Sequence, residues 1–133
     1  MPARKVPVLL NPYRAGGNWY KGAFHFHSTN SDGRISPSQA VMRYARSGYA
    51  VIGLSDHGFV TRFPRAWFPG KLLIPNFETA WPHLLHIGAS ATGRVPETGF
   101  ARSLARIRRD GAFGVLCHPG WSDCTSKDED PAL

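Results

Sequence analysis

Short apolar runs, each about as long as a strand, recur along most of the chain. They cover residues 23–27, 49–54, 72–77, 84–89 and 112–117. Helix signals lie between the first two runs and between the last two. Apolar runs of this length that alternate with helices are typical of strands in a parallel sheet. The pattern therefore predicts an α/β fold with mostly parallel strands.

The two predicted helices have recognisable ends. Ser36 offers a capping hydroxyl, and Pro37 fits a first turn. The first helix is therefore expected to run to about Ser47 and to stop at Gly48. The second helix is closed by Gly111, and its apolar positions are spaced three and four residues apart. The residues of that apolar face are Phe100, Leu104 and Ile107.

Size and composition indicate one globular domain, since the chain has 133 residues of which 42% are hydrophobic. No apolar run approaches the roughly 18 residues that a membrane-spanning helix needs, so we expect no membrane partner. The apolar stretch within residues 1–10 is too short, and too broken by proline, for a secretory leader. Cys117 and Cys124 are then expected to be reduced thiols in a cytoplasmic protein.

Charge divides the chain into unequal parts. The formal net charge is +7, yet four of the nine acidic residues lie in the range 123–133, which we separate as an acidic tail. We expect residues 19–122 to form the functional domain and residues 1–18 an N-terminal extension. A basic surface attracts anions such as phosphate esters or nucleic acid, although ordinary solubilising charge explains it equally well.

The arginines of the second predicted helix raise one alternative, a basic nucleic-acid-binding module. Four of them fall within about two helical turns, and the same pattern describes the solvated face of an ordinary helix, which we favour. These residues are Arg102, Arg106, Arg108 and Arg109.

The histidines avoid both predicted helices and gather where strands end. His25 and His27 end the first apolar run, His57 follows the second, and His118 follows the last. Glu78 follows the third run. Because the carboxyl ends of parallel strands meet at one edge of a sheet, these side chains are expected to lie close together.

The chemistry of these residues indicates a metal site. In the sequence His25-Phe26-His27 a strand directs both imidazoles to the same side, because its side-chain period is two. Asp32 follows in a loop, His57 has an acid beside it in sequence, and Glu78 can bridge two ions. Imidazole mixed with carboxylate suits Zn, Mn or Fe rather than Ca.

Four segments resemble, in order and spacing, the motifs of the PHP (polymerase and histidinol phosphatase) family. They are closest to those of its stand-alone members, predicted metal-dependent phosphoesterases. The segments are residues 19–33, 53–58, 75–79 and 115–121. The resemblance implies a hydrolase that acts on phosphate esters and contains two or three divalent metal ions.

The resemblance also implies a set of ligands. His25 and His27 would bind one ion together with Glu78. Glu78 would bridge to a second ion, held also by His118 and by His83.

A third metal position found in many members of the family would be formed by Asp32 and His57, and Asp56 would orient the site. The family usually has a histidine followed by two apolar residues and then, shortly after, a glycine. His83 fits that pattern, so we favour it over His86 as the ligand. His86 is expected on the opposite face of its strand as a packed or surface residue.

The same resemblance implies that the ions activate water for attack on a phosphate ester. Basic residues near the mouth of the site would hold the substrate's phosphate, and Arg34 is our first choice. The other candidates are Arg62, Arg65 and Lys71. The expected substrate is a small phosphorylated molecule, with nucleotides and nucleic-acid fragments also open.

The sequence is shorter than is usual for members of the family. Members usually form a distorted (β/α)7 barrel and end with a further motif that supplies an Asp and a His to the metals. This sequence ends at Leu133 without that motif, so a partial (β/α)7 barrel is expected. Either the sequence is a fragment or truncated product, or a second copy of the chain completes the barrel. The missing motif also leaves open a metal-binding remnant without turnover.

Overall fold

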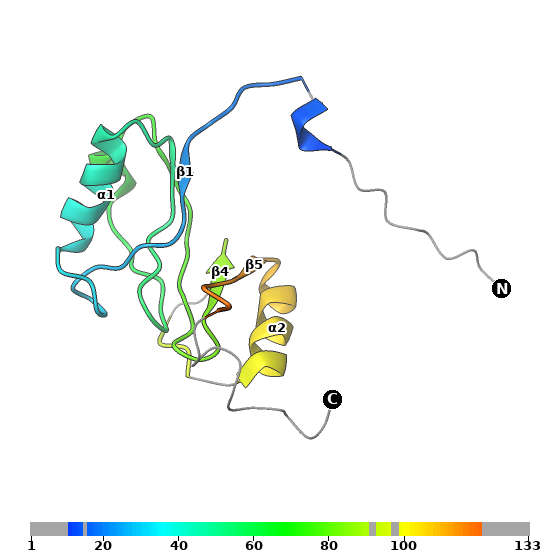
Figure 1. The fold of residues 1–133 in the computed structure, drawn as a ribbon. Coiled ribbons are helices and arrows are strands. Elements are labelled where there is room, and N and C mark those ends of the chain that lie inside the picture. The colour runs from blue at the N-terminus through cyan, green and yellow to red at the C-terminus, as the bar shows by residue number, and fades with distance from the viewer. Residues whose placement is uncertain (1–10, 15, 91–92, 97–98, 121–133) are drawn as a thin grey trace.

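The structure is a computed structural model that describes residues 11–14, 16–90, 93–96 and 99–120 (Figure 1). Its helices are α1 (Pro37–Arg46) and α2 (Gly99–Asp110), with short 3-10 helices η1 (Pro12–Arg14) and η2 (Arg65–Trp67). Its strands are β1 (Gly22–Ala23), β2 (Val51–Ile52), β3 (Leu72–Leu73), β4 (Leu84–Ile87) and β5 (Phe113–Leu116). No helix among these residues is long and apolar enough to cross a membrane.

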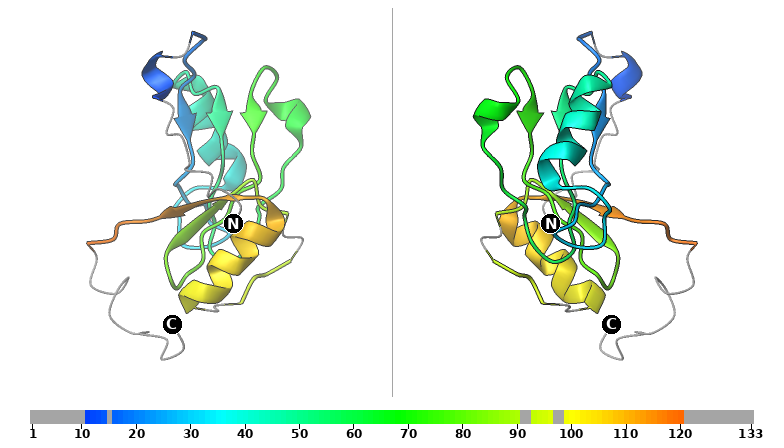
Figure 2. Two further views of the ribbon diagram at one scale, coloured as in Figure 1. Left: turned by 90° about the vertical axis from the view of Figure 1, so that its right-hand side faces the viewer. Right: turned by 90° about the vertical axis from the view of Figure 1, so that its left-hand side faces the viewer.

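The strands form two sheets. One is parallel, with the order β1-β2-β3, and the other pairs β4 with β5 in antiparallel orientation. Figure 2 shows α1 beside the parallel strands and α2 against β4 and β5. The predicted mixed α/β class with mostly parallel strands in one sheet is confirmed. The antiparallel β4–β5 pair differs from the expectation, because an apolar run does not specify the direction in which it pairs.

The parallel ladders are much shorter than the predicted strands, although single backbone bonds continue past them. The Ser55 N–H donates to the carbonyl of Phe26 (2.9 Å), and the Glu78 N–H donates to the carbonyl of Asp56 (3.3 Å). Side chains add further bonds there. The Asn76 amide donates to the carbonyl oxygens of Phe24 (2.6 Å) and Gly53 (3.1 Å). The Ser55 hydroxyl accepts a bond from the amide of Phe26 and donates one to its carbonyl.

Helix α1 begins and ends as predicted. The Ser36 hydroxyl accepts from the backbone N–H of Gln39, whose side chain in turn accepts from the Ser36 N–H, a capping box. The helix ends before Gly48, where φ is +83°. Val41 of α1 is fully buried and belongs to the main core cluster. The other buried residues of that cluster are Ile52, Phe68 and Leu73.

Helix α2 buries a different face from the one predicted. Ile107 is buried, but Leu104 is 40% exposed and Ser103 is buried instead. The helix lies against only a two-stranded sheet, so a narrow stripe of residues four apart, Ser103 and Ile107, makes the contact. The acidic tail 123–133 and most of the extension 1–18 lie outside the described residues.

His86 in β4 is fully buried on the side of the strand away from Glu78 and stacks on Phe77, with ring centroids 4.3 Å apart. Neither of its ring nitrogens has a hydrogen-bond partner in the part of the chain that the structure describes. Burial, together with the positive charge of Arg106, lowers the pKa of His86 to about 4. His86 is therefore a packed, neutral histidine at physiological pH.

His86 makes stability depend on pH. Its pKa is lower in the folded state than in the unfolded chain, so the unfolded state binds more protons between about pH 6.5 and pH 4. We expect the metal-free protein to lose about 2–3 kcal/mol of unfolding free energy over this window through His86 alone. His86→Leu, which cannot titrate, should show a correspondingly smaller loss in urea denaturation at both ends of the window. Equal losses in the two proteins would contradict this assignment.

Candidate metal centre

The carboxylate of Glu78 is the centre of a histidine cluster. The side chain is 1% exposed, and imidazole nitrogens from separate segments surround both of its oxygens. At Oε2 lie His25 Nε2 (3.2 Å), His27 Nε2 (3.1 Å) and His57 Nδ1 (3.9 Å). At Oε1 lie His83 Nδ1 (3.0 Å) and His118 Nε2 (3.5 Å).

These side chains meet because of where their segments end. His25 and His27 follow β1, His57 and Glu78 follow β2 and β3, and His118 follows β5. His57 and Glu78 form an isolated parallel bridge, and Glu78 also pairs with Leu85 of β4 in the antiparallel sense. The position of Glu78 thus joins the two sheets.

Asp32 brings a second carboxylate to the cluster. Its Oδ1 lies 3.4 Å from His27 Nδ1, and its Oδ2 lies 3.6 Å from His57 Nε2. Gly33 allows the loop to approach this closely, since a Cβ there would lie 2.3 Å from the carbonyl oxygen of His27. The loop that carries Asp32 therefore rests directly on the segment that carries His27.

Three groups of residues in the described chain have ligand atoms close enough to hold a metal ion, with all atoms of a group within 4.8 Å of one another. Six of the seven residues that the sequence suggested as ligands belong to these groups, and the seventh, His118, lies at Oε1 of Glu78. His83 rather than His86 lies at Glu78. The groups are His25, Glu78 and Cys117; His27, Asp32 and His57; and His57, Glu78 and His83.

Asp56 lies beside the cluster as a buried structural acceptor. It is fully buried, and its carboxylate accepts hydrogen bonds from the backbone N–H and the hydroxyl of Ser28, both at 2.7 Å. The hydroxyls of Ser31 (2.9 Å) and Thr61 also donate to it. Asp56 therefore ties the loop after His27 to the end of β2. Arg34 is exposed and lines none of these groups, and its catalytic role stays a prediction.

Electrostatics keep the central carboxylate charged. Burial alone would raise the pKa of Glu78, but the hydrogen bonds from His25 and His27 outweigh burial and hold that pKa well below its usual range. At His27, burial alone would lower the pKa, but the hydrogen bond to Glu78 and the nearby carboxylates outweigh burial, so the pKa of His27 is raised. Burial lowers the pKa of His57. The pKa of Asp32 is lowered despite burial, chiefly by the charge of His27.

The donor set fits divalent metal ions. Among the described residues, the buried Nδ1 atoms of His27 and His57 have no hydrogen-bond partner, although each faces a carboxylate oxygen. Buried polar nitrogens are normally bonded, and a cation placed between imidazole and carboxylate would satisfy them. Imidazole and carboxylate together suit Zn, Mn or Fe.

Two residues beside the centre were missed by sequence reasoning. The sequence predicts only a reduced thiol at Cys117. Its proximity to Glu78 depends on the fold and has no signal in the sequence. Arg94 lines a cavity of about 330 Å³ together with Asp32, His57 and Thr79. Its only signal in the sequence was its charge. A larger cavity of about 490 Å³ between α1 and the first strands contains only one of the suggested ligands, His27.

No family model and no curated protein matches the sequence. Among solved structures, the fold resembles that of a two-domain protein from Bacteroides vulgatus that contains a predicted PHP-like metal-dependent phosphoesterase. The TM-score is 0.63 at 26% sequence identity. The match covers 82% of this chain but only 38% of that one.

Glu78 should be indispensable for metal binding. Loss of a group that only orients a ligand costs about 10- to 100-fold in metal affinity, so Glu78→Gln should cost at least that much. Metal titration followed by elemental analysis measures the effect. Asp110→Asn is the matched control, because Asp110 is also nearly buried and charge-paired but belongs to none of the three groups. Equal metal loss in both variants would place the site elsewhere.

Proposed function

We propose that this chain is a metal-dependent hydrolase that cleaves phosphate esters with a metal-activated water. The observation that carries the proposal is the convergence of histidines on the buried carboxylate of Glu78, with Asp32 against two of those histidines. The similarity to a predicted phosphoesterase supports it. We further propose that the fold is part of a PHP-type (β/α)7 barrel and that two or three ions bind.

In this proposal some residues of the chain bind the metal ions and others keep those ligands in position. Glu78 would bridge two ions, with His25 and His27 on one side and His83 and His118 on the other. Asp32 and His57 would hold a third. When bound, divalent ions lower the pKa of a coordinated water and stabilise charge on phosphoryl oxygens.

Asp56 would act through the loop that it anchors. Its bonds to Ser28 and Ser31 keep the segment between His27 and Asp32 in place. A small displacement of catalytic groups costs orders of magnitude in rate, so rigid support of this loop matters.

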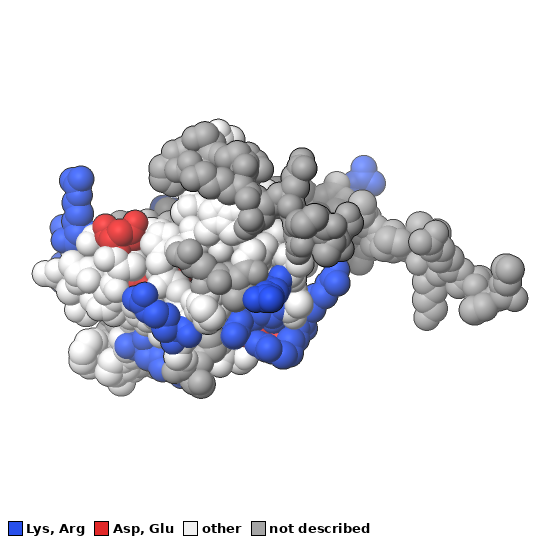
Figure 3. Space-filling view, turned by 90° about the horizontal axis from the view of Figure 1, so that it is seen from below, with Lys and Arg blue, Asp and Glu red and all other residues white. Residues whose placement is uncertain are grey.

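We propose that Arg94 binds the phosphate group of the substrate. It is exposed and lies over the ring of Phe59, 5.7 Å from the ring centroid, at the cavity that reaches Asp32 and His57. A guanidinium there can donate two parallel hydrogen bonds to a phosphate oxygen pair. Figure 3 shows basic side chains in several separate groups on one face of the molecule, with little acid between them. A basic surface of this kind favours the approach of an anionic substrate.

The function is tested with an aryl phosphate and purified protein loaded with Mn or Zn. We expect turnover that a chelator abolishes and that added metal restores. The double variant His25→Ala and His27→Ala should lose both metal and turnover. Bound metal without any hydrolysis would overturn the proposal in favour of a metal-binding protein that does not turn over.

Arg94→Ala should weaken phosphate binding without loss of metal. A charge-assisted hydrogen bond is worth about 1.5–3 kcal/mol, so kcat/KM should fall roughly 10- to 100-fold and inhibition by inorganic phosphate should weaken. Arg62→Ala is the matched control. The sequence also made Arg62 a candidate for the phosphate, but the structure places it at a different cavity that contains none of the suggested ligands. Unchanged inhibition by phosphate in Arg94→Ala would remove Arg94 from the site.

A further inference from the structure

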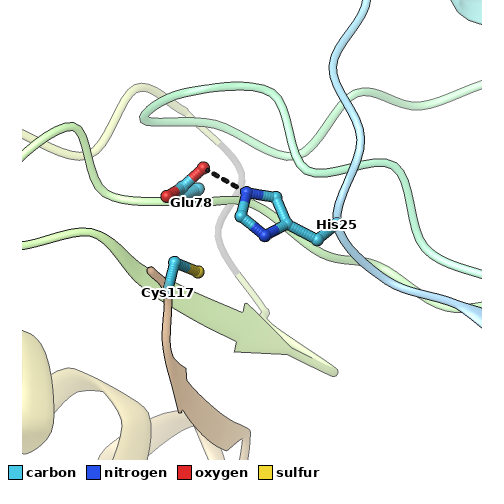
Figure 4. Close-up of side chains that lie close together, drawn as sticks. All are labelled: His25, Glu78 and Cys117. Atoms are coloured by element: carbon cyan, nitrogen blue, oxygen red, sulfur yellow. Dashed lines mark hydrogen bonds and ion pairs between the residues drawn. The ribbon is translucent and has the colours of Figure 1, made fainter. Parts of the chain in front are cut away.

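A thiol lies inside the histidine cluster. Cys117 is 3% exposed, and its sulfur is within 4.8 Å of the ligand atoms of both His25 and Glu78. Figure 4 shows the three side chains together, with Cys117 arriving from the end of β5 and His25 joined to Glu78. The two partners are themselves in contact, with Nε2 of His25 3.2 Å from Oε2 of Glu78. Nitrogen, oxygen and sulfur donors therefore surround one small space.

The backbone explains how two consecutive residues reach the same carboxylate. In an extended strand Cys117 and His118 would point to opposite faces. At His118, however, φ is +31°, a left-handed conformation that is uncommon outside glycine. The amide of Cys117 is held by the carbonyl of His83 at 2.8 Å. The turn therefore leaves Cys117 beside the carboxylate of Glu78 and brings His118 Nε2 to 3.5 Å from Oε1.

The Cys117 thiol donates to the carbonyl oxygen of Val115 over 3.7 Å. The strained conformation at His118 costs free energy, and such strain gathers at functional sites. The left-handed conformation at His118 allows Cys117 and His118 to reach the same site, which is a physical reason for the strain.

We propose that Cys117 is a ligand of the ion held by His25 and Glu78, and that its sulfur makes this position prefer zinc over manganese. The inference rests on the proposed metal-dependent function. Binding replaces the thiol proton with a metal–sulfur bond, and the proton leaves to solvent. Thiolate is a soft ligand that favours Zn, whereas Mn favours carboxylate and water.

Cobalt(II) is the first probe, because a thiolate ligand gives cobalt a charge-transfer absorption that imidazole and carboxylate do not. The full chain loaded with cobalt should show this band, and Cys117→Ala should abolish it while cobalt remains bound through the histidines. Cys124→Ser is the matched control, because Cys124 is the only other cysteine in the sequence, and it should keep the band. Circular dichroism checks that each variant is folded.

The outcomes separate the two proposals. Cobalt that binds the wild-type protein without a thiolate band, or with a band that survives Cys117→Ala, overturns the role of Cys117 alone. A wild-type protein that binds no cobalt, zinc or manganese overturns the metal-dependent function, and the role of Cys117 with it.

Two further measurements do not depend on the fold of Cys117→Ala. X-ray absorption of zinc-loaded Cys124→Ser should show one sulfur at about 2.3 Å from zinc, and a shell of only nitrogen and oxygen would overturn the proposal. Cys117→Ser, which keeps the size of the side chain, should weaken zinc at least about tenfold. Its affinity for manganese should change much less, and equal losses for both metals would refute the selectivity.

Discussion

The buried carboxylate of Glu78 is the point on which the rest of the structure depends. An ionised carboxylate out of water is costly unless other groups compensate its charge. Here histidines from both sheets supply that compensation, and the hydrogen bonds of His25 and His27 keep the group ionised. The backbone of Glu78 adds to this role, because its carbonyl accepts from Gly58 and its N–H donates to Asp56. One residue thus joins the parallel sheet, the antiparallel pair and the candidate site.

The shortness of the parallel ladders is part of the same arrangement. Where the regular ladders end, Asn76 and Ser55 bond to backbone groups of neighbouring segments, so those backbone groups have partners. Asp56 does the same for the loop after His27. Buried polar side chains therefore supply at this edge the bonding that a regular sheet supplies elsewhere.

The distribution of charge is compatible with the proposed phosphate-ester substrate. Outside the acidic tail the chain is basic, and two of its few acids, Asp32 and Glu78, face the histidine cluster. Divalent ions at these carboxylates would turn the centre positive, and Arg94 stands at the cavity beside it. On α2, Arg106 and Arg109 pair with Asp110.

The sequence by itself determined what depends on neighbours along the chain. Ser36, Pro37 and Gly48 set the limits of α1, and the apolar runs placed His25, His27, His57 and Glu78 at strand ends, which is why they converge. Only the tertiary structure decided the antiparallel pairing of β4 with β5, the burial of Ser103 in place of Leu104, and the presence of Cys117 and Arg94 at the site. Those features depend on contacts between distant segments and on the left-handed turn at His118, which no local periodicity encodes.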